Sequence, residues 1–279
     1  GDILPLGSTL RVTGKRNKTR IIPLLEAVKA AIEDYIELCP YPMMRDEPFE
    51  IEVENAKGEK EMWRPGNANG SFSMREMPIK RALAQSINSV TARLTNEVGA
   101  DTVMYYAKKM GIKSPLKAVA SIGLGSFDVN LFEMIGAYSA FVNEGMHVEP
   151  MLVQEIKDQN GKVLQRFDPT MEQVIRKESA QLVRYMLEGV IHESGTGSSL
   201  LYGEGDILLP KENRYARVFA GKTGTTSNHS DGWFIGMSHN LISGVWVGGD
   251  DRSIHFRTGA LGEGSKTALP IFKRFMIKV

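Results

Sequence analysis

A short run near the C-terminal end carries groups that could bind an anionic, extended ligand. Residues 222–226 read Lys-Thr-Gly-Thr-Thr and follow a strand-like segment. Lys222 offers a positive charge and Thr225 a hydroxyl to a carboxylate, while Gly224 lets another backbone approach closely. These residues therefore suit an extended ligand that pairs with a sheet edge. The simpler interpretation, held equally open on this run alone, is a strand that ends in a polar turn.

A second candidate pair lies well upstream, in the tripeptide Ser86-Ile87-Asn88. Polar side chains separated by one residue point the same way from an extended or turn segment, but not from a helix. Taken alone, such a tripeptide is usually structural. It becomes informative together with Lys222, which follows Ser86 by 136 residues in the order typical of one group of acyl-transferring enzymes.

The elements that would position these residues are helices in the middle of the chain and strands towards its end. Helices are predicted over residues 23–36, 79–98, 102–110, 129–143, 178–192 and 266–277. Gly99, Gly111 and Gly145 stand where helix C-caps belong. The basic stretch 11–20 is expected to be a surface loop, and residues 39–72 an irregular excursion rather than core.

Strands are predicted where apolar runs are separated by short turns. Residues 153–157 and 163–167 flank Asn160-Gly161, a strong hairpin signal. Residues 218–223, 233–237 and 241–247 suit an antiparallel meander, and 1–4 and 49–53 short strands. The pattern predicts an α+β fold with a central antiparallel sheet flanked by helices, organised as a single domain over residues 1–279.

Composition excludes several classes of protein. The chain holds 34 Lys and Arg against 33 Asp and Glu, a net charge of +1, with no basic stripe for nucleic acid. Cys39 is the only cysteine, so an intrachain disulfide and a cysteine zinc site are impossible. The five histidines have no metal-ligand spacing, and we expect neither a metal nor a cofactor. No apolar run of about 18 residues is present.

The chain resembles the transpeptidase domain of class A penicillin-binding proteins of the bacterial 1A-like type. The similarity rests on stretches in one order along most of the sequence: 1–4, 63–65, 81–88, 110–116, 124–126, 195–197, 221–226, 231–236, 245–251 and 268–272. The Ser-x-Asn and Lys-Thr-Gly elements of the family signature are both among them. The resemblance implies the penicillin-binding fold, an α+β architecture around an antiparallel sheet.

The resemblance also implies an acyl transfer and the residues that would serve it. A serine in a Ser-x-x-Lys motif attacks a stem peptide ending in D-Ala-D-Ala, and the lysine of that motif deprotonates it. Ser86 would relay a proton to the leaving amine, and Lys222 would add positive potential. The implied substrate-binding residues are Asn88, Thr223, Gly224 and Thr225, of which the two threonines would bind the terminal carboxylate.

The implied partners are peptidoglycan stem peptides and β-lactam antibiotics, without nucleic acid. The implied location is the extracytoplasmic face of the bacterial inner membrane, in the periplasm, through an anchor. The anchor and the glycosyltransferase domain of the family are not found in these 279 residues.

The Ser-x-x-Lys motif itself is missing where the resemblance places it. It should head a helix about sixty residues before Ser86, but residues 18–30 contain no serine. Ser114 begins the only literal Ser-x-x-Lys, downstream of Ser86 in a turn. Ser8 is followed three residues later by Arg11, which cannot serve as a general base, and Thr19 has Arg20 beside it.

Three functions therefore stay open. The first is a D,D-transpeptidase domain, and the second is a non-catalytic module that binds D-Ala-D-Ala or penicillin through a degenerate site. The third is a serine β-lactamase, disfavoured because no glutamate has the sequence context of a water-activating base. A covalent penicillin adduct would separate the first two, and penicillin turnover would identify the third.

Overall fold

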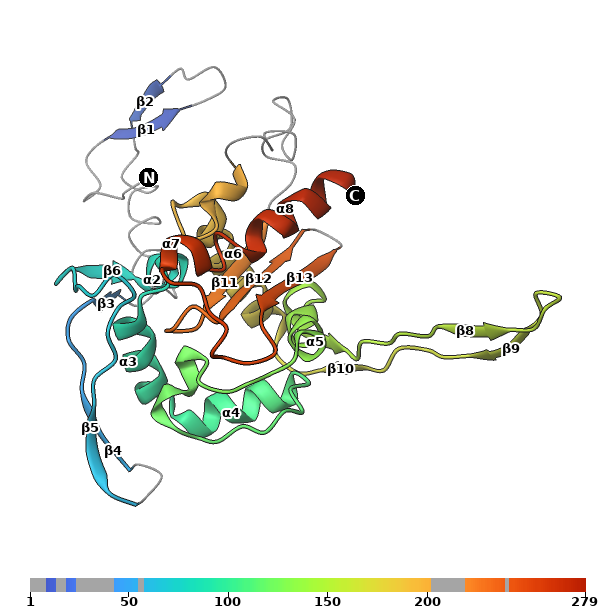
Figure 1. Cartoon of the computed structure of the whole chain (residues 1–279). Coiled ribbons are helices and arrows are strands. Elements are labelled where there is room, and N and C mark those ends of the chain that lie inside the picture. The colour runs from blue at the N-terminus through green and yellow to red at the C-terminus, as the bar shows by residue number, and fades with distance from the viewer. Residues whose placement is uncertain (1–8, 14–18, 24–42, 55–57, 202–218, 239–240) are drawn as a thin grey trace. The chain divides into compact units, whose positions relative to one another are not determined.

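The chain divides into two compact units, residues 1–42 and 43–279. The computed structural model describes residues 9–13, 19–23, 43–54, 58–201, 219–238 and 241–279 (Figure 1). The strand predicted at 1–4 and residues 24–36 of the first predicted helix lie outside these ranges. The single domain expected over residues 1–279 stays a prediction.

The first unit contains an antiparallel hairpin of β1 (Thr9–Thr13) and β2 (Thr19–Pro23). The surface loop expected over 11–20 is therefore wrong at both of its ends. Val12 and Ile21 are β-branched and favour extended backbone. The loop was expected because arginines and lysines dominate the composition of this stretch. Pro23, predicted to begin a helix, instead ends β2.

A three-stranded antiparallel sheet lies at the centre of the second unit. It consists of β11 (Ala220–Thr225), β12 (Asp231–Met237) and β13 (Ile242–Gly248), in that order. Lys222 stands opposite Ile235, and Phe234 opposite Val245. The predicted meander is confirmed, with the first strand beginning and ending two residues later than expected.

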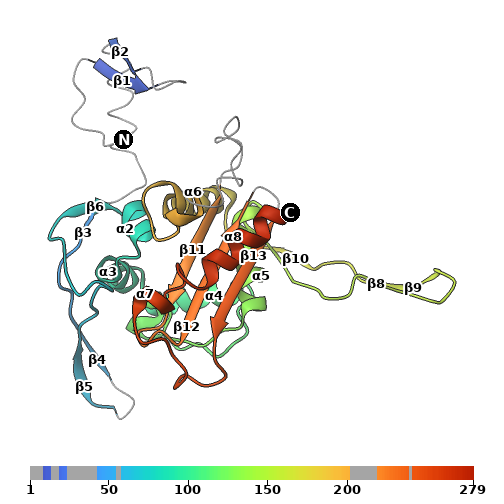
Figure 2. The ribbon, with the colours of Figure 1, turned by 45° about the horizontal axis from the view of Figure 1, so that its top comes forward.

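Helices cover both faces of this sheet (Figure 2). The C-terminal helix α8 (Ala268–Lys278) packs on one face, where the rings of Phe234 and Phe272 meet edge to face at 4.8 Å. Gly236 permits this approach, because a Cβ there would lie 2.4 Å from the Phe272 ring. On the other face, Leu187 of α6 (Lys177–His192) packs with Ala220 and Met237.

Four further helices of the described residues lie beside the sheet. They are α2 (Ile79–Gln85), α3 (Asn88–Val98), α4 (Ala100–Lys109) and α5 (Leu131–Val142). The short helix η2 (Ala120–Leu124) lies between α4 and α5, η3 (Ser198–Leu201) follows α6, and α7 (Gly259–Gly262) precedes α8. The predicted helix 79–98 is wrong in one respect, since it breaks at Ser86, whose backbone is left-handed (φ 56°, ψ 47°). Gly99, Gly111 and Gly145 all have positive φ at or just beyond helix ends, as predicted.

Within the described part of the second unit, four two-stranded ladders accompany the sheet. They pair β3 (Met43–Arg45) with β6 (Glu76–Pro78), β4 (Ile51–Glu54) with β5 (Lys60–Trp63), β7 (Met146–Val148) with β10 (Met171–Gln173), and β8 (Glu155–Lys157) with β9 (Val163–Arg166). The last is the predicted hairpin, with Gly161 at φ +82°, and it extends away from the sheet in both ribbon views. None of the helices in the described ranges is long and apolar enough to cross a bilayer.

The segment expected to lie outside the core contributes to it. Met44 packs with Met77, Ala82 and Val90 in a buried cluster beneath α2 and α3. The prediction for residues 39–72 is therefore wrong for part of this stretch. Its Pro and Gly content reflects turns between short strands, and the Met44 side chain of β3 still faces inward.

Candidate active site

The two candidate motifs meet in space. Lys222 Nζ donates a hydrogen bond to Ser86 Oγ at 2.9 Å, although the residues are 136 positions apart. The same ammonium donates to the carbonyl of Thr223, also at 2.9 Å. Both side chains are partly buried, so this contact between α2 and the sheet is shielded from bulk water. The two motifs therefore share one contact, while the roles of Ser86 and Lys222 stay predictions.

Burial changes the acid–base character of the lysine. Removal of water from around the ammonium lowers the pKa of Lys222 from 10.5 to about 8. At pH 7 roughly a tenth of the lysine is therefore neutral at any moment. An amine of this pKa, hydrogen-bonded to a hydroxyl, can both supply a proton to that hydroxyl and take one back near neutral pH.

The fold holds Ser86 in place by ending a helix at it. Ser86 is the C-cap of α2, and its N–H donates to Leu83 O at 3.1 Å. Left-handed backbone is uncommon for a residue other than glycine and often marks a constrained site. The next residue, Ile87, donates to Ala82 O, which closes the helix end. The break turns the Ser86 hydroxyl towards Lys222 instead of continuing along the helix.

Thr196 is a site residue that sequence reasoning missed. Its hydroxyl lies 2.6 Å from the hydroxyl of Thr223, and its N–H donates to Ala84 O in α2. Gly195 is buried so closely that a Cβ would lie 2.7 Å from the same Ala84 carbonyl. Thr196 thus ties β11 to the helix that carries Ser86. Its stretch, 195–197, was noted only as part of the family resemblance.

Thr225 and Gly224 form the end of the same strand. Thr225 is exposed, and its Oγ1 accepts a hydrogen bond from the N–H of Gly264 at 3.0 Å. Gly264 fits against the sheet because it has no side chain, since a Cβ would lie 2.3 Å from Trp233 O and 2.5 Å from Gly224 O. A Cβ on Gly224 would meet Trp233 Cβ at 3.1 Å, which also leaves little space there.

Asn88 begins helix α3, two residues beyond Ser86. Its Nδ2 donates to Gly66 O at 2.8 Å, which fixes the amide nitrogen and so determines which end of the side chain is the acceptor. The structure therefore brings Ser86, Lys222 and Thr223 into one hydrogen-bonded group. It places Thr225 on β11, the strand of Lys222 and Thr223, and Asn88 at the start of α3, two residues after Ser86.

Of the alternative nucleophiles, Ser114 receives no support from its surroundings. Ser114 donates its hydroxyl to Glu133 at 2.7 Å, at the start of α5, with no lysine in that contact. Thr19 belongs to β2, in the other compact unit, and Ser8 lies outside the described residues. Among the described residues, the serine hydroxyl that contacts a lysine amine is that of Ser86, at the end of α2.

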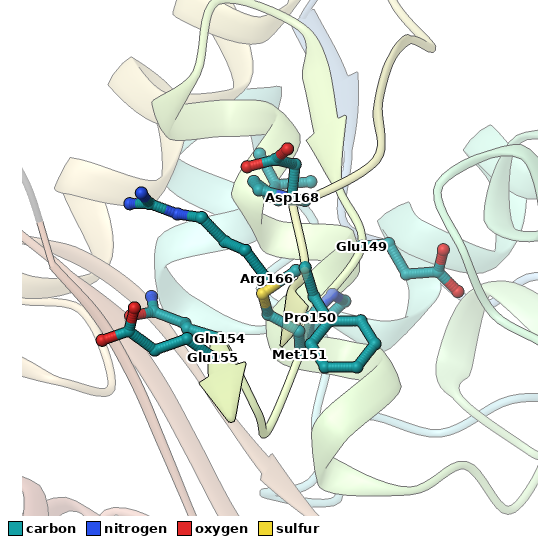
Figure 3. Close-up of a pocket in the computed structure, with 10 residues that line it drawn as sticks. Glu149, Pro150, Met151, Gln154, Glu155, Arg166 and Asp168 are labelled. Carbon is teal, nitrogen blue, oxygen red and sulfur yellow. The ribbon is translucent and has the colours of Figure 1, made fainter. Parts of the chain in front are cut away.

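A pocket elsewhere shares no residue with this group. It lies at the base of the β8–β9 hairpin (Figure 3) and is lined by Val148, Glu149, Pro150, Met151, Gln154, Glu155, Arg166, Phe167, Asp168 and Pro169. Its charged side chains are surface residues of an open hollow. We therefore take the Ser86–Lys222 contact, and not this pocket, as the candidate active site.

Comparison with known proteins agrees with the sequence resemblance. The family described as the penicillin binding protein transpeptidase domain matches residues 45–276. Penicillin-binding protein 1A of Aquifex aeolicus is 34% identical over 221 residues, covering 79% of this chain and 28% of that protein. Penicillin-binding protein 1A of Rickettsia felis is 31% identical over 279 residues, covering 96% of this chain and 33% of that protein.

Solved structures show the same fold. Penicillin-binding protein 1A of Haemophilus influenzae superposes with a TM-score of 0.73 at 24% identity, covering 85% of this chain and 38% of that one. The predicted α+β penicillin-binding fold is confirmed. The chain spans about a third of the length of the relatives named above. On the match over residues 45–276, the chain belongs to the family of penicillin-binding-protein transpeptidase domains.

Proposed function

We propose that this domain is a peptidoglycan D,D-transpeptidase domain that binds stem peptides ending in D-Ala-D-Ala, and β-lactams, between α2 and β11. The observation that carries the proposal is the 2.9 Å contact between Lys222 Nζ and Ser86 Oγ. A solved neighbour, the PonA1 protein of Mycobacterium tuberculosis, is described in complex with penicillin V, with a TM-score of 0.62 and 23% identity. That description supports a β-lactam as a ligand of this fold.

In this proposal Ser86 and Lys222 move the proton of the acyl-transfer step. A nucleophile hydroxyl gives its proton to the base of its own motif, and its oxygen forms a bond to the penultimate D-Ala carbonyl carbon. The bond from that carbon to the terminal D-Ala nitrogen breaks. The departing amine takes a proton from Ser86 Oγ, and Lys222 replaces it from its ammonium. The pKa of about 8 for Lys222 suits this exchange, because a donor near the working pH gives its proton readily.

The strand end supplies the anchor for the substrate. Thr225 and Thr223 would bind the terminal carboxylate near the charge of Lys222, and Asn88 would hold the substrate amide. Thr225 is exposed at the end of β11, where an incoming chain can reach it. The charge-assisted bonds that a carboxylate forms at such a place are stronger than neutral ones.

The nucleophile decides between this function and the alternative. The alternative, a module that binds D-Ala-D-Ala ends without acylation, differs from this function only in lacking a nucleophile, and residues 18–30 contain no serine. Both functions use the same substrate-binding residues, Asn88, Thr223 and Thr225. We propose the extracytoplasmic face of the inner membrane as the location, since peptidoglycan lies there.

Calorimetry with an N-acylated peptide ending in D-Ala-D-Ala tests the proposal. We expect binding by the wild-type chain and roughly 10- to 100-fold weaker binding by Lys222→Ala, because a bond to a charged group contributes about 1.5–3 kcal/mol. Lys108→Ala removes a charge from the exposed face of α4 and should leave the affinity unchanged. Equal affinity of wild type and Lys222→Ala would contradict the proposed site.

A further inference from the structure

A cluster of buried polar side chains lies beneath the start of α3. Asp46, Asn67 and Ser89 have exposed fractions of 2%, 8% and 0%. They come from three segments: the residue after β3, the loop that follows β5, and the first turn of α3. Buried polar groups stabilise a single arrangement only when all are hydrogen-bonded. The contacts of these three residues meet that condition.

The Asp46 carboxylate is the centre of the cluster. Oδ1 accepts from Ser89 Oγ at 2.7 Å and from Asn67 Nδ2 at 2.8 Å. Oδ2 accepts from the N–H of Ser73 at 2.7 Å. Burial raises the pKa of Asp46, but the bonds from Ser73, Ser89 and Asn67 outweigh this effect and hold the pKa below its usual value. The carboxylate is therefore charged at neutral pH and orients three donors.

Helix α3 depends on this cluster for its start. Its N-cap is Ile87, which has no side-chain oxygen to accept from the first N–H groups. Asn67 Oδ1 replaces the missing cap by accepting from the N–H of Ser89 at 3.1 Å. Asp46 holds the other end of the same Asn67 amide, so the carboxylate determines which way that amide points.

The cluster reaches the candidate site through Asn88. Gly66, next to Asn67, accepts the hydrogen bond from Asn88 Nδ2, and Asn88 itself precedes Ser89. Asp46 thus holds Asn67 and Ser89, the residues that adjoin the acceptor and the donor of this bond. We infer that Asp46 is a positioning residue for Asn88, acting through Asn67 and Ser89, and that it orients the Asn88 amide to receive the substrate amide. The substrate part of this inference rests on the proposed function.

A double-mutant cycle on the whole chain separates positioning from simple stabilisation. The variants are Asp46→Asn, Asn88→Ala and their combination, and the probe is the N-acylated D-Ala-D-Ala peptide in calorimetry. We expect each single variant to weaken binding about fivefold or more, the value of one hydrogen bond. The combination should bind no more weakly than Asn88→Ala, because Asp46 acts only through Asn88. Effects that multiply in the combined variant would overturn the inference.

Ser139→Ala is the matched control for lost stability. Ser139 is also buried and polar, donates to Gly136 O and accepts from the N–H of Val148, and belongs to α5. It should lower the melting temperature and leave the peptide affinity unchanged. Should Asp46→Asn fail to fold, Ser89→Ala removes one donor to the carboxylate and keeps the Ser89 N–H, so it should weaken binding in the same direction.

A second readout does not depend on the proposed function. With asparagine labelled by ¹⁵N, the side-chain amide signals of Asn88 are identified by their loss in Asn88→Ala. We expect Asp46→Asn, but not Ser139→Ala, to shift these signals and speed their exchange with water. Unchanged Asn88 signals in Asp46→Asn would refute positioning, whether or not the peptide binds. A wild-type chain that binds no peptide would refute the proposed function alone.

Discussion

The stability of the chain should record the titration of Lys222. Its pKa is about 8 in the folded chain and 10.5 when unperturbed, so between these values the unfolded chain binds more protons. Stability from this residue therefore rises with pH across that interval. At about 1.36 kcal/mol per pH unit the full effect is ~3 kcal/mol, of which ~2 kcal/mol should develop between pH 7.5 and 10.

Lys222→Met isolates this contribution, because methionine has a similar length and does not titrate. Urea unfolding of both proteins between pH 7.5 and 10 gives a difference in free energy of unfolding at each pH, in which the other titrating groups cancel. We expect the value for wild type minus Lys222→Met to rise by ~2 kcal/mol. Lys108→Met gives the reference for loss of one surface charge. If this difference in free energy of unfolding stays constant with pH, the pKa of Lys222 is not lowered by burial, and the proposed acid–base role is refuted.

Three further outcomes are expected. Intact-protein mass spectrometry after incubation with excess penicillin should show no stable adduct, because residues 18–30 hold no serine; a gain of one penicillin would be traced by peptide mapping to Ser8, Thr19 or Ser86. Gly264→Ala should lower stability by about 1–3 kcal/mol in thermal unfolding, since its Cβ would overlap two backbone oxygens of β11 and β12, and wild-type stability would show that the loop moves freely. The stability that the Asp46 carboxylate contributes should be fully present above pH 3.8 and be lost as the pH falls through the lower pKa of the folded state. Acid unfolding of wild type and Asp46→Asn checks this, and a free-energy difference between them that does not change with pH would contradict it.

The sequence predicted the parts of the site whose residue types are unusual for their position. Lys222 in a strand followed by glycine, and Ser86 two residues before Asn88, are informative because the two motifs occur together in the right order. Their contact could be expected although 136 residues separate them. The meander β11–β13 was also predictable, since its turns are short and its strands are apolar.

The residues that support the site could not be predicted in the same way. Asp46 and Asn67 lie in a stretch rich in Pro, Gly and Asn, a composition typical of loops on the surface. Their burial depends on Ser89, more than twenty residues beyond Asn67, and no local pattern encodes such a contact. Thr196 meets Thr223 only because α6 and β11 lie side by side, which is a property of the folded chain.

The break in the predicted helix 79–98 has a similar cause. The residues around Ser86 have ordinary helix preferences, and periodicity alone favours one continuous helix. The chain leaves the helix at Ser86 because packing against α6 and the hydrogen bond to Lys222 stabilise a left-handed residue there. Tertiary contacts thus override local preference at the position where the chemistry is proposed.

A crystal structure of the chain with a bound N-acylated peptide ending in D-Ala-D-Ala would test the central claim most directly. The account predicts the peptide extended along β11, with its carboxylate within about 3 Å of Thr225 Oγ1 and its amide at the Asn88 side chain. The terminal peptide bond would lie beside the Ser86–Lys222 contact. A peptide bound at the hollow lined by Glu149 and Asp168, with the space beside β11 empty, would contradict the account.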